Sequence, residues 1–281
     1  VDTDPVALFT GVAPATWSNR ESWDHVDWKL GVEFDAADES MLYASAQTGF
    51  QPGTFDVFPD TTTRESELLA FTVGSKNRLL GGRLLLNNEV FYYLFDNLLT
   101  QAFDAATGTN RLTNADVVIY GDQLDLAYVP KSMSATRFTL SLGYLHARYD
   151  DFLLDTLDAF NDNQLQNAPD WTGTLGIVHD WTLRSGAYIR ADLSSRFESG
   201  FWGDFSHSSG LYQERYTKTD LAVTYYSGSG NWSVGLWAKN LENQDVQAAA
   251  ATGNPVTDPG PGAPFLEAPR TFGARFTYRS D

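Results

Sequence analysis

The chain contains no cysteine among its 281 residues. This absence excludes disulfide bonds, thiolate catalysis and cysteine-based zinc sites. Basic residues are also few, because 19 Lys and Arg stand against 36 Asp and Glu, and the formal net charge is −17. A protein that binds a phosphate backbone needs the opposite sign of charge. We therefore expect no nucleic-acid partner.

Long apolar runs are missing too. No stretch approaches the roughly 18 apolar residues that a transmembrane helix requires, and the sequence does not begin with the basic segment and apolar run of a signal peptide. Aromatic residues, by contrast, make up 14% of the chain. Such an excess is typical of the aromatic girdles that mark the two membrane interfaces of an outer-membrane barrel.

Catalytic and metal-binding patterns are equally scarce. The four histidines (His25, His146, His179 and His207) are scattered, and no pair has the spacing of metal ligands. No serine lies in a GxSxG turn, and the acidic segment 150–163 lacks the ligand offsets of a calcium loop. We therefore expect no metal, no cofactor and no enzymatic activity, although an outer-membrane enzyme barrel remains an alternative.

Apolar residues recur at every second position along much of the chain, which is the period of a strand with one apolar face. In 188–197, one face carries Ile189, Ala191, Leu193 and Phe197, and the other carries Tyr188, Arg190, Asp192, Ser194 and Arg196. The same pattern predicts ten more strands, near 23–35, 40–48, 66–76, 83–95, 117–129, 136–149, 171–182, 216–226, 232–240 and 270–279.

The connections between these strands alternate in length. Short turns near 36–39, 77–82, 130–135, 183–185 and 227–230 alternate with long loops near 49–65, 97–115, 150–169, 199–214 and 242–267. Transmembrane barrels have this arrangement, with tight turns on one side of the membrane and long loops on the other. The pattern predicts an all-β, transmembrane antiparallel β-barrel; a soluble β-sandwich or lectin-like module is the alternative.

A barrel wall of this kind has a polar inner face. We expect its charged side chains to pair with one another across neighbouring strands; these are Arg190, Asp192, Arg196, Lys218 and Asp220. Eleven strands are an odd number, whereas bacterial single-chain barrels have an even number. Because every backbone group must be paired in lipid, we expect the missing strands to come from the same protein or from a second chain.

Several phrases resemble the barrel of TonB-dependent outer-membrane receptors. They follow the order of that family and are LYASAQTGFQPGTF at 42–55, Glu67 with FTVGSK at 71–76, LLLNNEVFYY at 84–93, PDWT at 169–172, WAKNLEN at 237–243 and PRTFG at 269–273. Two positions depart from the pattern. Thr72 stands where the family often has Glu, and Asp122 is expected to point outward, toward lipid.

The resemblance implies the second half of a 22-stranded barrel. In this interpretation 1–22 is an extracellular loop segment, and 23–281 is the C-terminal part of the barrel without the plug and the TonB box. It implies a location in the outer membrane of a Gram-negative bacterium. It also implies contact with membrane lipid, with an N-terminal plug and the remaining strands, and with TonB-ExbB-ExbD through that N-terminal part. The implied function is uptake of a bulky, scarce small molecule, foremost a ferric siderophore; a carbohydrate or cobalamin is the alternative.

One loop carries aromatic side chains between glycines. Phe201, Trp202, Phe205 and His207 lie in the segment GFWGDFSH at 200–207, and the pattern of loop lengths puts this segment on the outer side. These four residues are therefore candidates for contact with a ligand. The alternative is that they pack the loop against its neighbours.

Overall fold

The computed structural model describes residues 20–56, 61–104, 109–154, 157–158, 160–205, 207, 210–251 and 263–280. In these residues the chain is all-β apart from one short 3₁₀ helix, η1 (Lys131–Met133). No helix in the described part is long and apolar enough to cross a membrane. Of the predicted loop segment 1–22, residues 1–19 lie outside the described residues.

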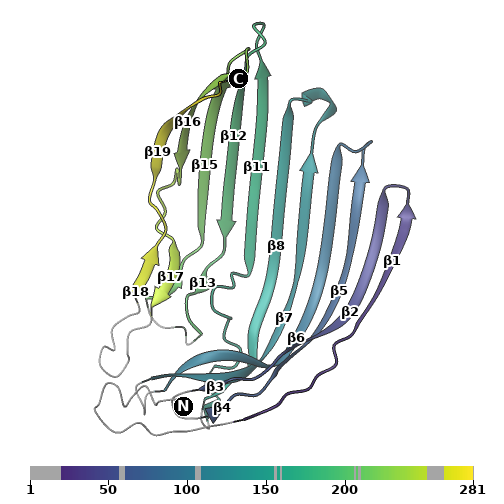
Figure 1. Ribbon diagram of the computed structural model, residues 1–281, viewed down its shortest axis with the longest axis vertical. Helices are drawn as coiled ribbons and strands as arrows, with labels where there is room; N and C mark the ends of the chain where they lie inside the picture. The colour runs from purple at the N-terminus through teal and green to yellow at the C-terminus, as the bar shows by residue number, and fades with distance from the viewer. Residues whose placement is uncertain are drawn as a thin grey trace.

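Eleven strands form one antiparallel sheet in which each strand pairs with the next one along the chain (Figure 1). The predicted number of strands is confirmed. Their bounds are β1 (Lys29–Ala37), β2 (Ser40–Gln51), β5 (Ser66–Leu79), β6 (Leu84–Asp104), β7 (Thr109–Tyr128), β8 (Thr136–Asp151), β11 (Trp171–Thr182), β12 (Tyr188–Glu198), β15 (Tyr216–Tyr226), β16 (Trp232–Lys239) and β19 (Thr271–Tyr278).

Short turns join these strands at one end of the sheet. In the turn after β5, Leu80, Gly81 and Gly82 have φ angles of 57°, 66° and 79°. Two of these three positions are glycine, which adopts positive φ without steric cost. Gly230, with φ of 77°, has the same role between β15 and β16. The predicted turn at 227–230 is thus confirmed, and the turn predicted near 77–82 is confirmed from Leu80 onward, because β5 continues to Leu79.

The opposite end of the sheet carries the long connections, and four of them contain small hairpins that the sequence did not reveal. In Figure 1 the labelled strands β3, β4, β13, β17 and β18 lie toward the lower end of the sheet. They are β3 (Phe55–Asp56) with β4 (Thr61–Thr62), β9 (Leu153–Leu154) with β10 (Leu157–Asp158), β13 (Phe201–Trp202) with β14 (Tyr212–Gln213), and β17 (Gln247–Ala251) with β18 (Ala263–Leu266).

Two predicted boundaries are wrong. The first strand begins at Lys29 rather than near 23. At the next position the Trp28 N–H bonds to the Thr48 hydroxyl at 3.0 Å instead of to the backbone, while the Trp28 carbonyl still accepts the Thr48 N–H, so the regular pairing ends there. The predicted loop 97–115 is mostly strand, since β6 and β7 stay paired as far as Asp104 and Thr109. A bulge between Phe95 and Leu98 shifts the register there and breaks the alternation that marks a strand.

The register separates the two faces of the sheet as predicted. One row, on the convex face, is apolar and crosses six strands through Phe138, Ile177, Leu193, Leu221, Ala238 and Phe272. A second row, on the concave face, is polar and crosses seven strands through Lys76, Asn87, Asp125, Ser141, Thr174, Arg196 and Lys218. A single sheet with these faces excludes the two-layer sandwich.

The apolar face is exposed over its whole extent. Phe276 is 68% exposed and Leu236 is 64% exposed, and large apolar side chains on nine further strands are exposed with them. Soluble monomers rarely leave apolar patches larger than a few hundred Å² in water. The convex face therefore has the character of a surface that contacts acyl chains.

Two aromatic girdles border this face. Toward the long loops, Tyr144 packs against Trp171 with ring centroids 4.9 Å apart. Tyr92 and Tyr120 stand opposite each other two residues closer to the long loops. Toward the short turns, Tyr225 packs against Trp232 at 5.2 Å. Amphipathic rings favour the interface between hydrocarbon and water, so the girdles agree with a membrane-spanning sheet.

Candidate ligand-binding vestibule

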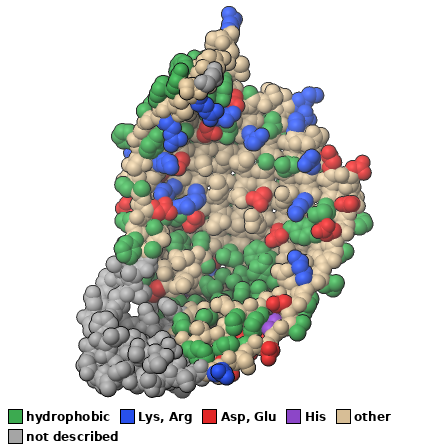
Figure 2. Space-filling view, viewed as in Figure 1, with side chains coloured by type: hydrophobic (Ala, Val, Ile, Leu, Met, Phe, Trp, Pro, Cys, Tyr) green, Lys and Arg blue, Asp and Glu red, His purple; other side chains and the backbone are tan. Residues whose placement is uncertain are grey.

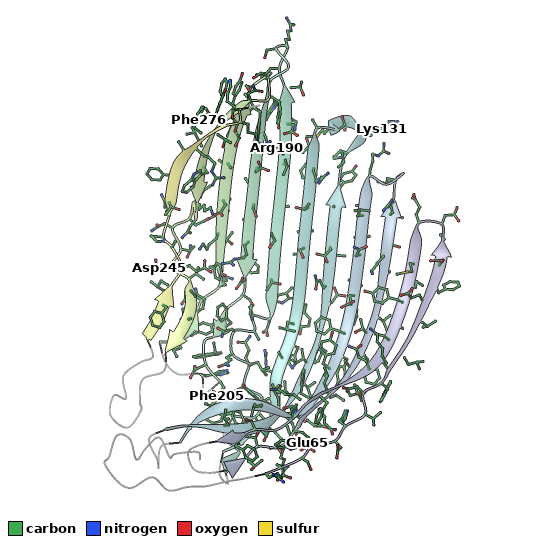
Figure 3. All side chains as sticks on the ribbon, viewed as in Figure 1. Glu65, Lys131, Arg190, Phe205, Asp245 and Phe276 are labelled. Atoms are coloured by element: carbon green, nitrogen blue, oxygen red, sulfur yellow. The ribbon has the colours of Figure 1, made fainter. Side chains whose placement is uncertain are left out.

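The concave wall is charged near the short turns, and Arg190 there has a partner on the neighbouring strand. Arg190 and Asp180 stand directly opposite each other on β12 and β11. The Arg190 guanidinium donates two hydrogen bonds of 2.8 Å, one to each oxygen of the Asp180 carboxylate. Figure 3 shows Arg190 near the short-turn end of the sheet. The expected pairing between strands is confirmed for this arginine.

Glu267 forms a second charged group on this wall. It lies between β18 and β19, yet it accepts a hydrogen bond of 3.1 Å from Arg196 on β12 and another from Lys218 on β15. Arg196 also lies 3.6 Å from Glu198. Burial raises the pKa of the Glu267 carboxyl, but the bonds from Lys218 and Arg196 outweigh that effect, so its pKa is lowered.

Toward the long loops the concave wall becomes apolar and aromatic (Figure 2). Phe91 and Tyr93 on β6 stack with ring centroids 5.0 Å apart. Gly121 is opposite Phe91 on β7, and a Cβ there would come within 2.6 Å of the Phe91 ring. The glycine therefore lets the phenyl ring lie flat against the wall.

A hollow of about 420 Å³ lies at the border between the aromatic and the charged parts of the wall. Phe91, Leu145 and Pro169 contribute apolar surface, and Gln123, Thr172 and Glu198 contribute polar groups. Gln123, Gly143, Thr172 and Glu198 form one register row across β7, β8, β11 and β12. A concave, mostly apolar site with a few converging polar groups is the usual form of a small-molecule site.

The connection between β8 and β11 folds over the aromatic end of the wall. Phe152 is completely buried, and it packs against Phe160 and Phe205 with ring centroids 5.2 Å and 5.5 Å apart. The side chains of Asn161 and Asn163 brace this connection, because one accepts the Phe152 N–H and the other donates to the Phe205 carbonyl. Two polar members of the acidic segment 150–163 thus hold a loop together.

The four candidate ligand contacts separate into three environments. Phe201 is only 6% exposed and packs with Tyr216 and Val246. Phe205 belongs to the Phe152 cluster (Figure 3). Trp202 and His207 stack on each other, with ring centroids 4.5 Å apart and planes 8° from parallel.

Two neighbours of this aromatic pair were not recognised in the sequence. Tyr212 pairs with Trp202 in the β13–β14 hairpin, and their rings are 4.8 Å apart. The carbonyl of Gln164 lies 3.1 Å from the His207 Nε2 atom. A hairpin assignment for 201–213 would have brought Tyr212 next to Trp202, but two-residue strands have too little pattern to detect. Contact between these residues and a ligand stays a prediction.

Within the described residues, no group of three or more His, Cys, Asp or Glu side chains is arranged to hold a metal ion. Asp155, which belongs to the acidic segment, lies outside those residues. The absence of a resident metal or cofactor stays a prediction.

Long antiparallel strands, an apolar convex face between aromatic girdles and a polar concave wall under large loops define the wall of a transmembrane β-barrel of the receptor type. A family model described as "TonB dependent receptor-like, beta-barrel" matches residues 2–241. The chain belongs to this family, whose members are receptors and transporters of the Gram-negative outer membrane. The resemblance found in the sequence is confirmed.

Solved structures of receptors share this fold at low identity. The ferric yersiniabactin uptake receptor FyuA from Yersinia pestis has a TM-score of 0.71 and 12% identity, over 89% of this chain and 36% of that one. The ferric-catecholate import receptor Fiu from K12 E. coli has a TM-score of 0.67 and 18% identity, and the match covers 95% of this chain and 37% of that one. The copper transporter OprC has a TM-score of 0.66 and 14% identity, and the match covers 89% of this chain and 39% of that one. The chain thus spans little more than a third of the length of these receptors.

Proposed function

We propose that this chain forms part of an outer-membrane receptor that takes up a bulky, scarce nutrient, and that the nutrient is a ferric siderophore. The observation that carries the proposal is the hollowed concave wall, aromatic at the level of the long loops and polar below. A wall of this form can contact a large solute while the convex face contacts lipid. Similar structures include receptors for ferric yersiniabactin and ferric catecholate.

The proposal includes the partners that a receptor of this family uses. Residues 1–22 form an extracellular loop segment, and 23–281 form part of the barrel wall. Further strands complete the ring, a plug domain fills it, and TonB with ExbB and ExbD supplies energy through the N-terminal part. Unpaired strand edges are costly in lipid, which is the physical reason for further strands.

Trp202 and His207, in the connection between β12 and β15, are the proposed ligand contacts on the side of the long loops. Their stacked rings form a flat surface that an aromatic or planar chelating group can cover. Phe201 and Phe205 have packing roles beneath that surface, because their rings are held in separate apolar clusters.

Uptake by cells tests the proposal. A strain that lacks the protein and a complemented strain are supplied with radiolabelled iron as siderophore complexes, with labelled cobalamin and with labelled maltodextrin. We expect complementation to restore uptake of an iron complex alone. Restored uptake of cobalamin or maltodextrin but of no iron complex would replace the siderophore with that solute.

Two substitutions test whether Trp202 and His207 contact the ligand. We expect Trp202→Ala and His207→Ala to lower the affinity for the iron complex by about tenfold each, the loss typical of a stacked aromatic contact. Trp181→Ala is the matched control, because Trp181 lies on β11 in the girdle near the short turns. An equal loss in the control would assign the effect to barrel stability.

A further inference from the structure

We infer that the hollow beside Phe91 takes an uncharged or cationic complex with apolar surface, and that it discriminates against polyanionic chelates. This inference rests on the proposed uptake function and names the substrate class. In iron chemistry it favours hydroxamate complexes. Three hydroxamates neutralise ferric iron, whereas three catecholates leave a triply negative complex.

The lining of the hollow supplies no cation. The described residues that line it on the concave face are apolar or neutral, with the exception of Glu198, and none of them is a lysine or arginine. Asp122 also borders the hollow, but its side chain belongs to the convex face, where Asn88 donates to both of its carboxylate oxygens at 3.0 Å. A polyanion in the hollow would therefore meet the Glu198 carboxylate, whose cationic neighbour, Arg196 at 3.6 Å, is shared with Glu267.

The neighbouring basic side chains already have anionic partners. Arg148 donates a hydrogen bond of 2.8 Å to Asp170, next to Pro169 at the rim. Arg196 contacts Glu198 and Glu267, and Lys218 shares Glu267 with it. Drawing Arg148 toward a ligand would leave the Asp170 carboxylate without its cation, and drawing Arg196 away would leave Glu198 without its cation and Glu267 with Lys218 alone. Both changes are unfavourable for partly buried carboxylates.

The carboxylates below the hollow, in contrast, are held by neutral donors. Glu89 accepts a hydrogen bond of 2.7 Å from the Tyr43 hydroxyl. Asp125 accepts 2.6 Å and 3.1 Å bonds from the Ser141 hydroxyl and the Gln123 amide. Hydrogen bonds from neutral groups stabilise a carboxylate without cancelling its charge. Lys76 stands in the same register row as Asp125, with its ammonium 5.4 Å from the centroid of the Tyr43 ring, and it offsets part of this negative charge. Two carboxylates against one lysine leave a net negative charge next to the hollow, which attracts cations and repels anions.

The aromatic part of the wall also disfavours anionic ligands. Phe91 and Tyr93 offer stacked faces above the hollow. The negative face of an aromatic ring attracts cations and apolar groups and is unfavourable for anions. The negative carboxylates and the aromatic ring faces thus both favour cationic ligands over anionic ones.

Competition between two chelates tests the inference on the intact protein in cells. The probes are ferric desferrioxamine B, a trihydroxamate complex that is singly positive, and ferric enterobactin, a tris-catecholate complex that is triply negative. We expect the unmodified protein to bind and import the first at least tenfold better than the second. A preference for the tris-catecholate would overturn the inference and leave the proposed function standing.

A charge variant separates selectivity by charge from selectivity by shape. Gln123→Arg adds a cation to the lining of the hollow, and Gln123→Met is the neutral control of similar length. We expect the arginine variant to shift the ratio of the two affinities toward the tris-catecholate by about tenfold relative to the methionine variant. Equal ratios in the two variants would overturn the inference. Import of neither iron complex, together with import of cobalamin or a sugar, would overturn the proposed function and the inference with it.

Discussion

At the scale of single residues, Glu267 connects a loop to the barrel wall. It contacts Arg196 on β12 and Lys218 on β15, which are three and two positions away from β19 in the sheet. The lowered pKa of Glu267 means that the folded protein favours its charged form. This contribution to stability is present above the ordinary pKa of 4.5 and is lost as the pH falls through the lowered value.

Glu267→Gln removes the negative charge from this group. We expect the free energy of unfolding at neutral pH to fall by about 1–2 kcal/mol, because two partly buried cations lose their partner. The stability of the variant should also depend less on pH below 4.5. Denaturant unfolding of the protein in micelles across a pH series measures both effects. Glu39→Gln, in an exposed turn, is the control, and an equal loss there would contradict the assignment.

Asn88 and Asp122 are a polar pair on the apolar convex face. Asp122 stands opposite Tyr144 in the register, and so it lies at the level of the girdle near the long loops. The outward direction of Asp122 could be predicted from the alternation in β7. Its partner could not, because Asn88 and Asp122 are diagonal neighbours whose contact depends on the register between β6 and β7.

A double-mutant cycle measures this pair. Asp122→Leu leaves the Asn88 amide with the Gln123 carbonyl as its remaining partner, and we expect a loss of about 1–2 kcal/mol in unfolding free energy. Adding Asn88→Leu removes this amide, which has lost its carboxylate partner, from the lipid-facing surface. The double variant should therefore regain most of the loss. A double variant no more stable than the single one would show that the two side chains do not interact.

At the scale of elements, the β6–β7 hairpin bends at the bulge and continues past the sheet (Figure 1). Asn97 has a φ of 56°, and its N–H donates to the Asp116 carboxylate at 2.8 Å. Asn114 joins this bend to the connection before β5, since its amide donates to the Asn97 carbonyl at 2.7 Å and its oxygen accepts the Arg64 N–H at 2.9 Å. These side-chain bonds hold the outer part of the hairpin in place.

Asn114→Ala removes the link between the bend and the neighbouring connection. We expect amide hydrogen exchange in 98–104 and 109–115 to become about tenfold faster, while exchange in the part of β6 before the bulge stays unchanged. Asn77→Ala, which removes comparable amide bonds at the short-turn end of β5, is the matched control. Unchanged exchange beyond the bulge would show that the backbone ladder alone holds the hairpin.

The elements differ in how far the sequence predicts them. The strands of the main sheet were recognisable because each alternates over eight or more residues and ends at a turn. The outer halves of β6 and β7 were not, because the bulge shifts the alternation and residues such as Asn110 and Asn114 resemble a loop. The hairpins β13–β14 and β17–β18 are too short for a period, so the packing of Phe201 against Val246 could be seen only in three dimensions.

At the scale of the whole molecule, β1 and β19 are the two ends of the sheet within the described residues. They run in the same direction, because the chain reverses its direction ten times between these two strands of the antiparallel sheet. A second copy of this chain would therefore bring β19 beside β1 in parallel, unlike every pair in this antiparallel sheet. We expect strands of different sequence, odd in number, to complete the ring.

The most direct test of a membrane-spanning wall uses the absence of cysteine in this chain. Single cysteines at 188–197 of β12 are spin-labelled in the protein as it stands in its membrane, and their collisions with lipid-soluble oxygen and a water-soluble nickel complex are compared. We predict an alternation of period two, in which labels at Ile189, Ala191 and Leu193 favour oxygen and labels at Arg190 and Asp192 favour nickel. Uniform accessibility along the strand, or the opposite phase, would contradict the assignment of the convex face to lipid.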